Sequence, residues 1–152
     1  MQLNNHILRV PCVSAILFNS KGQVLLQQRD NKPELPYAGY WALFGGRIED
    51  GEQPEDALRR ELIEEIELDD IQLRFWKAYE RFHPEKQAVV IQHIYIGKIT
   101  LSVEKIVLHE GEAARYFDEM TLNHVPIAFG FDRLLIEFYA SSHLLTQDFD
   151  NG

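Results

Sequence analysis

The sequence has little of several features that define other classes of protein. Cys12 is the only cysteine among 152 residues, which excludes a disulfide framework and a zinc site built from several cysteines. No apolar run approaches the ~20 residues of a membrane-spanning helix. Residues 1–6 lack the basic and apolar stretches of a secretory signal. These absences predict a soluble, cytoplasmic protein that does not enter a membrane.

Basic residues are scarce in one stretch of the chain. The formal net charge is −9, and residues 49–70 hold eleven acidic residues but only two bases, Arg59 and Arg60. This difference of nine equals the net charge, so the rest of the chain is neutral. Duplex binding needs basic patches, so we expect no DNA-binding segment. Concentrated carboxylates instead suit a hard divalent cation, with a solvated acidic helix face as the alternative.

The pattern of apolar residues predicts a single α+β domain over residues 1–152, in which helices flank a mixed sheet. A hairpin is expected over residues 8–18 and 23–28, followed by a proline-rich loop over 30–39. Further strands are expected at residues 40–44, 72–82, 88–99 and 101–108. Helical segments are expected at residues 54–66, 112–118, 119–122 and 128–141. The tail is expected to be frayed from about residue 145.

Three glutamates share one face of the predicted helix over residues 54–66. At 100° per residue, Glu61, Glu64 and Glu65 lie within about 100° of arc. The apolar side chains that would dock the helix form an adjoining stripe of Leu58, Leu62 and Ile66. Like charges at this spacing repel each other, and a divalent cation would turn that repulsion into a binding site. Arg60 precedes Glu64 by four residues, so we expect it to pair with that carboxylate and orient it.

The spacing around this helix resembles that of a known family. Gly46, Glu52 and residues 60–68 match the Nudix box, which reads Gly, five residues, Glu, seven residues, Arg-Glu-aliphatic-any-Glu-Glu-any-Gly-aliphatic. Eight of the nine fixed positions are met, and Glu67 stands where the pattern has glycine. A non-glycine residue in the left-handed conformation costs about 1–2 kcal/mol. We therefore expect the helix to run on slightly, or to end differently around residues 69–70.

The resemblance implies a Nudix-like α/β/α sandwich and a reaction. Nudix enzymes hydrolyse a pyrophosphate bond in a nucleoside diphosphate linked to another group, using Mg²⁺ or Mn²⁺. Carried onto this sequence, the resemblance assigns the metal to Glu61, Glu64, Glu65 and the Gly46 carbonyl. Oxygen ligands at a partly open site suit Mg²⁺ better than zinc.

The resemblance also implies roles for residues outside the metal set. Arg60 would orient a glutamate, and Glu52 would hydrogen-bond within the loop or assist the helix carboxylates. The general base is either a box glutamate such as Glu64 or an acid on a later loop. Residues 110–112 offer that later position, and Glu112 is the candidate.

The substrate contacts are predicted from residue type alone. Arg29 and Arg47 are candidates for phosphate oxygens, and Tyr40 and Phe82 for stacking on a base, with surface or core positions as the alternatives. The expected partner is a small-molecule nucleotide, and a homodimer is left open. The competing functions are a Nudix domain that binds nucleotides without turnover and a metal-binding surface unrelated to catalysis. All four box glutamates are present, which favours an enzyme.

Overall fold

The computed structural model describes residues 7–149, apart from the side chain of residue 85. The absence of a secretory signal was predicted from residues 1–6, which lie outside the described residues, as do residues 150–152 of the predicted frayed tail. Within residues 7–149, no helix is long and apolar enough to cross a membrane.

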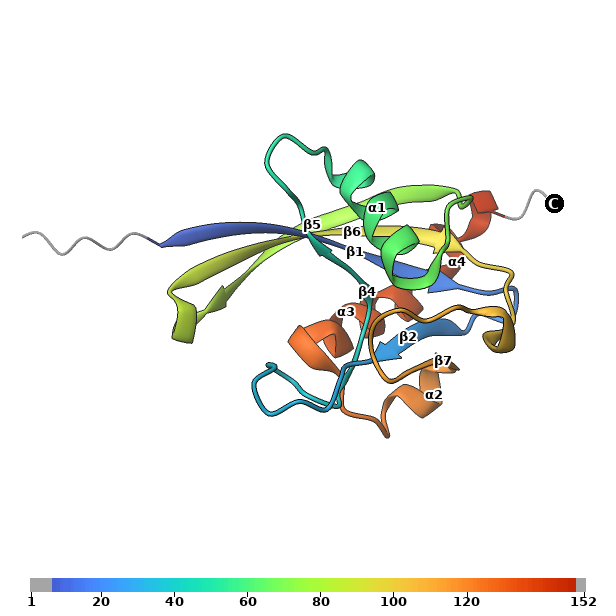
Figure 1. Cartoon of the computed structure of the whole chain (residues 1–152). Coiled ribbons are helices and arrows are strands. Elements are labelled where there is room, and N and C mark those ends of the chain that lie inside the picture. Colours follow the sequence, from blue (N-terminus) through green and yellow to red (C-terminus); the bar gives the residue numbers. More distant parts are fainter. Residues whose placement is uncertain (1–6, 150–152) are drawn as a thin grey trace, which may run out of the picture.

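In the described residues, 7–149, one mixed sheet of seven strands forms the centre of the fold (Figure 1). The main strand order is β3-β2-β1-β6-β5, with β4 paired to β1 and β7 paired to β2. β1 runs parallel to β6 along its whole length, and the other pairs are antiparallel. The strands are β1 Leu8–Phe18, β2 Val24–Gln28, β3 Trp41–Ala42, β4 Phe44–Arg47, β5 Leu73–His83, β6 Ala88–Lys98 and β7 Ala113–Phe117.

Helices cover both faces of this sheet. Successive side chains of a strand point to opposite faces, and the odd residues of β1 from Val13 to Leu17 pack in one core with helix α1, Pro54–Ile66. Ile16 packs on the other face, against helix α3, Phe131–Ala140. Figure 1 shows α1 and α3 on opposite sides of the central strands. The predicted α+β sandwich with a mixed sheet is confirmed, and α1 has the predicted bounds.

The strand expected over residues 40–44 is divided in two. β3 pairs with β2, whereas β4 pairs with β1, and Leu43 lies between them. The cause is the edge of β1, which pairs with β4 through Cys12–Ala15 and with β2 only at its last residues. The chain therefore crosses from one partner strand to another at Leu43. This crossing brings Gly45 and Gly46 to an opening in the sheet.

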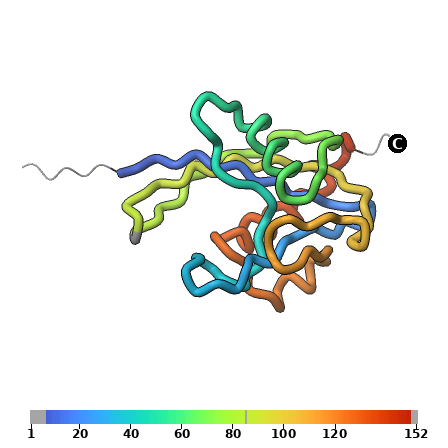
Figure 2. Tube along the Cα trace, viewed as in Figure 1, coloured from blue at the N-terminus to red at the C-terminus, as the bar shows by residue number. Residues whose placement is uncertain are grey.

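Two expectations for residues 101–118 are wrong. No strand forms over residues 101–108, where the only regular element is the 3₁₀ helix η2, Val103–Lys105. Residues 112–118, expected to be helical, instead contain β7, which pairs with β2 over its whole length. Strand formation depends on a free partner edge as much as on propensity, and the free edge of β2 selects the later segment. The backbone N–H of Glu112 bonds to Gln28 O, and Figure 2 shows these distant segments side by side.

The C-terminal helical region also differs in detail from its prediction. Two left-handed residues, Phe129 within the 3₁₀ helix η3, Ala128–Gly130, and Gly130 at the start of α3, prevent one helix over 128–141 from forming. The short helices α2, Glu119–Leu122, and α4, Ser142–Leu145, flank it. The tail is not frayed up to residue 149, because η4, Gln147–Phe149, places Phe149 against Phe18 with ring centroids 5.4 Å apart. A 3₁₀ helix η1, Pro84–Lys86, connects β5 to β6.

The end of α1 contradicts the expected extension. The helix stops at Ile66, and Glu67 adopts the left-handed conformation (φ 56°) that the pattern's glycine would favour. The Glu67 N–H then bonds to Ile63 O, which satisfies a carbonyl of the last turn. The Glu67 carboxylate lies 2.5 Å from His109 Nε2. The strained backbone of Glu67 therefore occurs at a position where its side chain contacts His109.

Candidate active site

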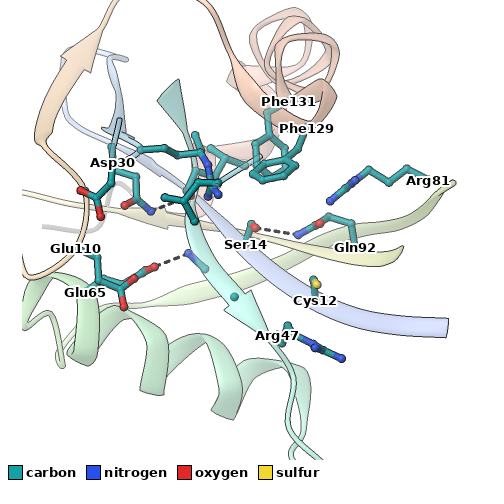
Figure 3. Close-up of a pocket in the computed structure, with 18 residues that line it drawn as sticks. Cys12, Ser14, Asp30, Arg47, Glu65, Arg81, Gln92, Glu110, Phe129 and Phe131 are labelled. Atoms are coloured by element: carbon teal, nitrogen blue, oxygen red, sulfur yellow. Dashed lines mark hydrogen bonds between the residues drawn. The ribbon is translucent and has the colours of Figure 1, made fainter. Parts of the chain in front are cut away.

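A cleft of about 430 Å³ opens where β4 leaves β1 and the loop before β7 approaches α1 (Figure 3). Its residues come from six strands, from α1, η3 and α3, and from three loops. They are Cys12, Ser14, Gln27, Arg29, Asp30, Leu35, Ala42, Leu43, Gly45, Gly46, Arg47, Glu65, Arg81, Gln92, Glu110, Gly111, Phe129 and Phe131. Figure 3 shows Glu65 and Glu110 on one side and Arg81 on the other, with Ser14 and Gln92 between them.

Glu65 is a buried carboxylate at the acidic side of the cleft. Its residue is only 2% exposed, and its Oε2 accepts a hydrogen bond of 3.1 Å from the Gly45 N–H. Burial, together with the negative charges of Glu61 and Glu110, raises the pKa of Glu65 to about 9. Glu65 is therefore packed together with the adjoining apolar stripe of α1, although it belongs to the predicted acidic face. A helix position between an apolar stripe and a cleft is buried once the sheet is in place.

Glu61 lies against the glycine at the start of the box. A Cβ atom on Gly46 would stand 2.5 Å from Oε1 of Glu61, so only glycine permits this approach. Burial raises the pKa of Glu61, and the hydrogen bond from Arg60 lowers it. Glu64, by contrast, has a side chain that is 53% exposed. The three carboxylates of the predicted face thus differ in solvent exposure, from buried Glu65 to exposed Glu64.

Arg60 joins the loop before α1 to the helix. Its Nε and Nη2 each donate a hydrogen bond of 2.9 Å to Glu52, and its Nη1 donates one of 3.0 Å to Glu61. The expected contact with Glu64 is longer, at 3.5 Å. The hydrogen bond from Arg60 holds the pKa of Glu52 at about 2. The main partner of Arg60 is therefore Glu52, and its bond to Glu61 orients that carboxylate.

The loop before β7 contributes an acid different from the one predicted. Glu110 lines the cleft, and its charge acts on both Glu61 and Glu65. Glu112 does not line the cleft, because its Oε1 accepts a hydrogen bond of 2.9 Å from the Asn31 N–H. The sequence already contained the signal, since both acids flank the same glycine. Only the turn at that glycine decides which carboxylate faces the cleft.

The predicted substrate residues divide into two groups. Arg29 and Arg47 line the cleft. Tyr40 lies outside it against Tyr37, with ring centroids 5.4 Å apart, and Phe82 is 55% exposed on β5. The structure adds cleft residues that the sequence reasoning missed, namely Cys12, Ser14, Arg81, Gln92, Phe129 and Phe131. Alternation along β1, β5 and β6 could have placed the strand residues on one face, whereas no local signal marks Phe129.

The carboxylates suit a cation although they do not form a ready ligand set. Within residues 7–149, no three His, Cys, Asp or Glu side chains have an arrangement that could hold a metal ion. The predicted set is not assembled, because Glu64 lies at the exposed edge beside Arg60. However, Glu61, Glu65 and Glu110 repel one another in a partly buried space. A divalent cation would remove this repulsion, so these oxygen donors fit such an ion.

A family model described as the NUDIX domain matches residues 8–138 of the chain. This protein belongs to the Nudix family. The match contains the whole box from Gly46 to Leu68, so Glu67 is a variation within a Nudix domain. Nudix hydrolases in general require a divalent metal ion, in agreement with the charges of this cleft.

Curated Nudix relatives are similar over part of their length. An RNA pyrophosphohydrolase of Azorhizobium caulinodans is 37% identical over 75 residues, which cover 46% of this chain and 45% of that protein. An 8-oxo-dGTP diphosphatase of Proteus vulgaris is 39% identical over 56 residues, which cover 37% of this chain and 48% of that protein. The chain thus spans about half the length, or less, of these relatives.

Solved Nudix structures share the fold over nearly the whole chain. The MutT protein of Methanosarcina mazei Go1 superposes with a TM-score of 0.75 at 20% identity, covering 90% of this chain and 97% of that one. The E. coli ORF135 protein superposes with a TM-score of 0.72 at 23% identity, covering 94% and 97%. The core sheet and its flanking helices are therefore those of Nudix proteins.

Proposed function

We propose that this Nudix protein hydrolyses a pyrophosphate bond in a nucleoside diphosphate linked to another group, with Mg²⁺ or Mn²⁺ as the cofactor. The observation that carries the proposal is the buried Glu65 carboxylate, which shares a cleft with Glu110 and with arginines. A cleft with both carboxylates and guanidinium groups matches a substrate that is itself anionic and is bound together with a cation. A bound divalent ion supplies charge neutralisation and lowers the pKa of a water molecule.

In this proposal the acidic side of the cleft holds the cation. Glu61, Glu65 and the Gly46 carbonyl would be its main ligands, and Glu64, at the exposed edge, would be a further one. Support comes from the close approach of Glu61 to Gly46 and from the repulsion that a cation would relieve. Arg60 acts as a positioning residue, because it bonds to both Glu52 and Glu61.

The remaining cleft residues act on water and substrate. We assign the general base to Glu110, whose carboxylate lines the cleft and would accept the proton of the attacking water at one of its oxygens. Glu112 instead holds the loop at Asn31. Arg29 binds the non-bridging oxygens of the diphosphate, as arginine does at anionic oxygens. The cytoplasmic location and the homodimer stay predictions.

A substrate panel tests the proposal. The protein is incubated with Mg²⁺ and nucleoside triphosphates, sugar nucleotides, dinucleoside polyphosphates or ADP-ribose, and the products are separated by chromatography. Turnover by the parent protein should be lost in Glu65→Gln and kept in Glu104→Gln, a control at an exposed acid of η2. Binding without turnover would indicate a nucleotide-sensing Nudix domain instead. The absence of both binding and turnover would overturn the proposal.

A further inference from the structure

The side of the cleft away from the carboxylates is built from a row of residues on one face of the sheet. Cys12 of β1 is directly opposite Arg47 of β4 and, on its other side, Gln92 of β6. Gln92 is in turn opposite Tyr79 of β5. Residues paired across strands have their side chains on the same face, and Arg81 lies two residues after Tyr79 and shares that face. The register therefore brings Arg47 and Arg81 to the same floor, on either side of Cys12.

Arg81 is a cation without an anionic partner. Among the described side chains of residues 7–149, which do not include that of residue 85, no carboxylate lies within ion-pair distance of its guanidinium, and its buried Nε has no hydrogen-bond partner. Its neighbour is the ring of Phe129, whose centroid lies 5.0 Å from Cζ. A buried charged donor left unsatisfied is costly, so such groups have a partner in the functional state. Because Arg81 lines the cleft, a bound ligand would supply that partner.

Phe129 holds arginines rather than offering a free surface to a base. Its ring lies within cation–π distance of two guanidinium groups, at 4.9 Å from Arg29 and 5.0 Å from Arg81. The Tyr37 ring also meets it edge-on, with centroids 4.9 Å apart. With these neighbours in place, this part of the cleft attracts an anion.

The charges of Arg47 and Arg81 both act on the Cys12 thiol, which lies between them in the cleft. Burial raises the pKa of the Cys12 thiol, whereas the charges of Arg81 and Arg47 lower it. The fields of the two guanidinium groups therefore meet at this point of the floor, in agreement with the strand register.

We propose that Arg47 and Arg81 bind a second phosphate of the substrate, one that is not part of the diphosphate being hydrolysed. The substrate class is then a nucleoside diphosphate derivative that carries a further phosphate remote from the scissile bond. Two guanidinium groups match the charge of a phosphate dianion, whereas a carboxylate would leave one cation unpaired. Figure 3 supports a remote position, because Arg81 lies across the cleft from Glu65 and Glu110. This inference rests on the proposed function for its substrate but not for its phosphate site.

The single cysteine permits a test that does not need turnover. Cys12 is alkylated with iodoacetamide in the metal-free protein, with and without inorganic phosphate, and the rate is followed by mass spectrometry. Phosphate should slow the reaction, because it covers the thiol and reduces the field of the arginines. Arg81→Gln should raise the phosphate concentration needed for half protection by about tenfold or more. Arg81→Lys, which keeps the charge but loses the planar fork, should give an intermediate value.

Pairs of substrates that differ only in the remote phosphate test whether this site contributes to the reaction. Coenzyme A is compared with its form lacking the 3′-phosphate, and NADP with NAD, both with Mg²⁺. In each pair that is hydrolysed, the phosphorylated member should have a kcat/KM about tenfold higher, and Arg81→Gln should remove this preference. Arg133→Gln, an exposed change on α3, should leave it unchanged.

The outcomes separate the two proposals. Protection of Cys12 by phosphate without hydrolysis of any substrate would leave the phosphate site standing and refute the hydrolase. The second phosphate site would be overturned if the parent protein hydrolysed both members of a pair equally well. It would also be overturned if phosphate did not protect Cys12 in the parent protein. Circular dichroism of each arginine variant verifies that it is folded.

Discussion

Replacement of the buried, titratable carboxyl group of Glu65 should change how the stability of the metal-free protein depends on pH. In the folded protein the pKa of Glu65 is raised from 4.5 to about 9, mainly by burial. The folded state therefore binds one more proton than the unfolded chain between these two values, and its free energy of unfolding falls as the pH rises. The slope is about 1.4 kcal/mol per pH unit. At pH 7 the penalty amounts to about 3 kcal/mol, and Glu65→Gln should remove it.

Urea denaturation in EDTA at pH 5 to 8.5 measures this effect. Titrating groups distant from Glu65 contribute equally to the parent protein and the variant, so the difference between them isolates residue 65 and its coupled neighbours Glu61 and Glu110. We expect the two proteins to have similar stability at pH 5, with the variant increasingly more stable at higher pH. Glu64→Gln is the matched control, because that side chain is 53% exposed and its removal relieves no buried charge. Parallel curves for the parent and Glu65→Gln would refute the reasoning.

The metal dependence of the same pair completes the experiment. A cation bound at the carboxylates replaces the proton on Glu65, so Mg²⁺ should stabilise the parent protein at pH 8 more than the variant. Loss of a ligand in a metal-assisted displacement should also lower turnover by at least ~10²-fold. A variant that is stable but hydrolyses as fast as the parent would remove Glu65 from the site.

Three further predictions concern the helix end, the loop acid and the metal. Glu67→Gly should raise the free energy of unfolding by about 1 kcal/mol, since relief of the left-handed backbone outweighs the exposed contact with His109; a lower melting temperature would contradict this. Glu110→Gln should reduce kcat by about 10²-fold, whereas Glu112→Gln should leave kcat near the parent value. If steady-state kinetics showed the larger loss of kcat in Glu112→Gln, the base would be Glu112. Millimolar Mg²⁺ should raise the melting temperature of the parent protein, and calorimetry without any heat of divalent binding would refute the cation site.

Local patterns were sufficient where the physical cause is local. The bounds of α1 follow from Pro54, which starts the helix, and from the spacing of its apolar stripe. The box spacing likewise depends on one loop and one helix, so it identified the family and the residues around Gly46 before any tertiary contact was known. Local propensity failed at residues 101–117, because β7 exists only where β2 offers a free edge.

The sequence by itself determined the Nudix family, the sandwich of helices on a mixed sheet, and the helix that carries the carboxylates. Only the tertiary structure decided that Glu65 is buried while Glu64 is exposed, since a helical angle does not say how far the sheet extends beside it. It also decided that Glu110 faces the cleft, and that Arg81 and Phe129 meet there from segments 48 residues apart. Charge and burial at a point in space depend on all the elements that converge on it. No window along the chain contains that information.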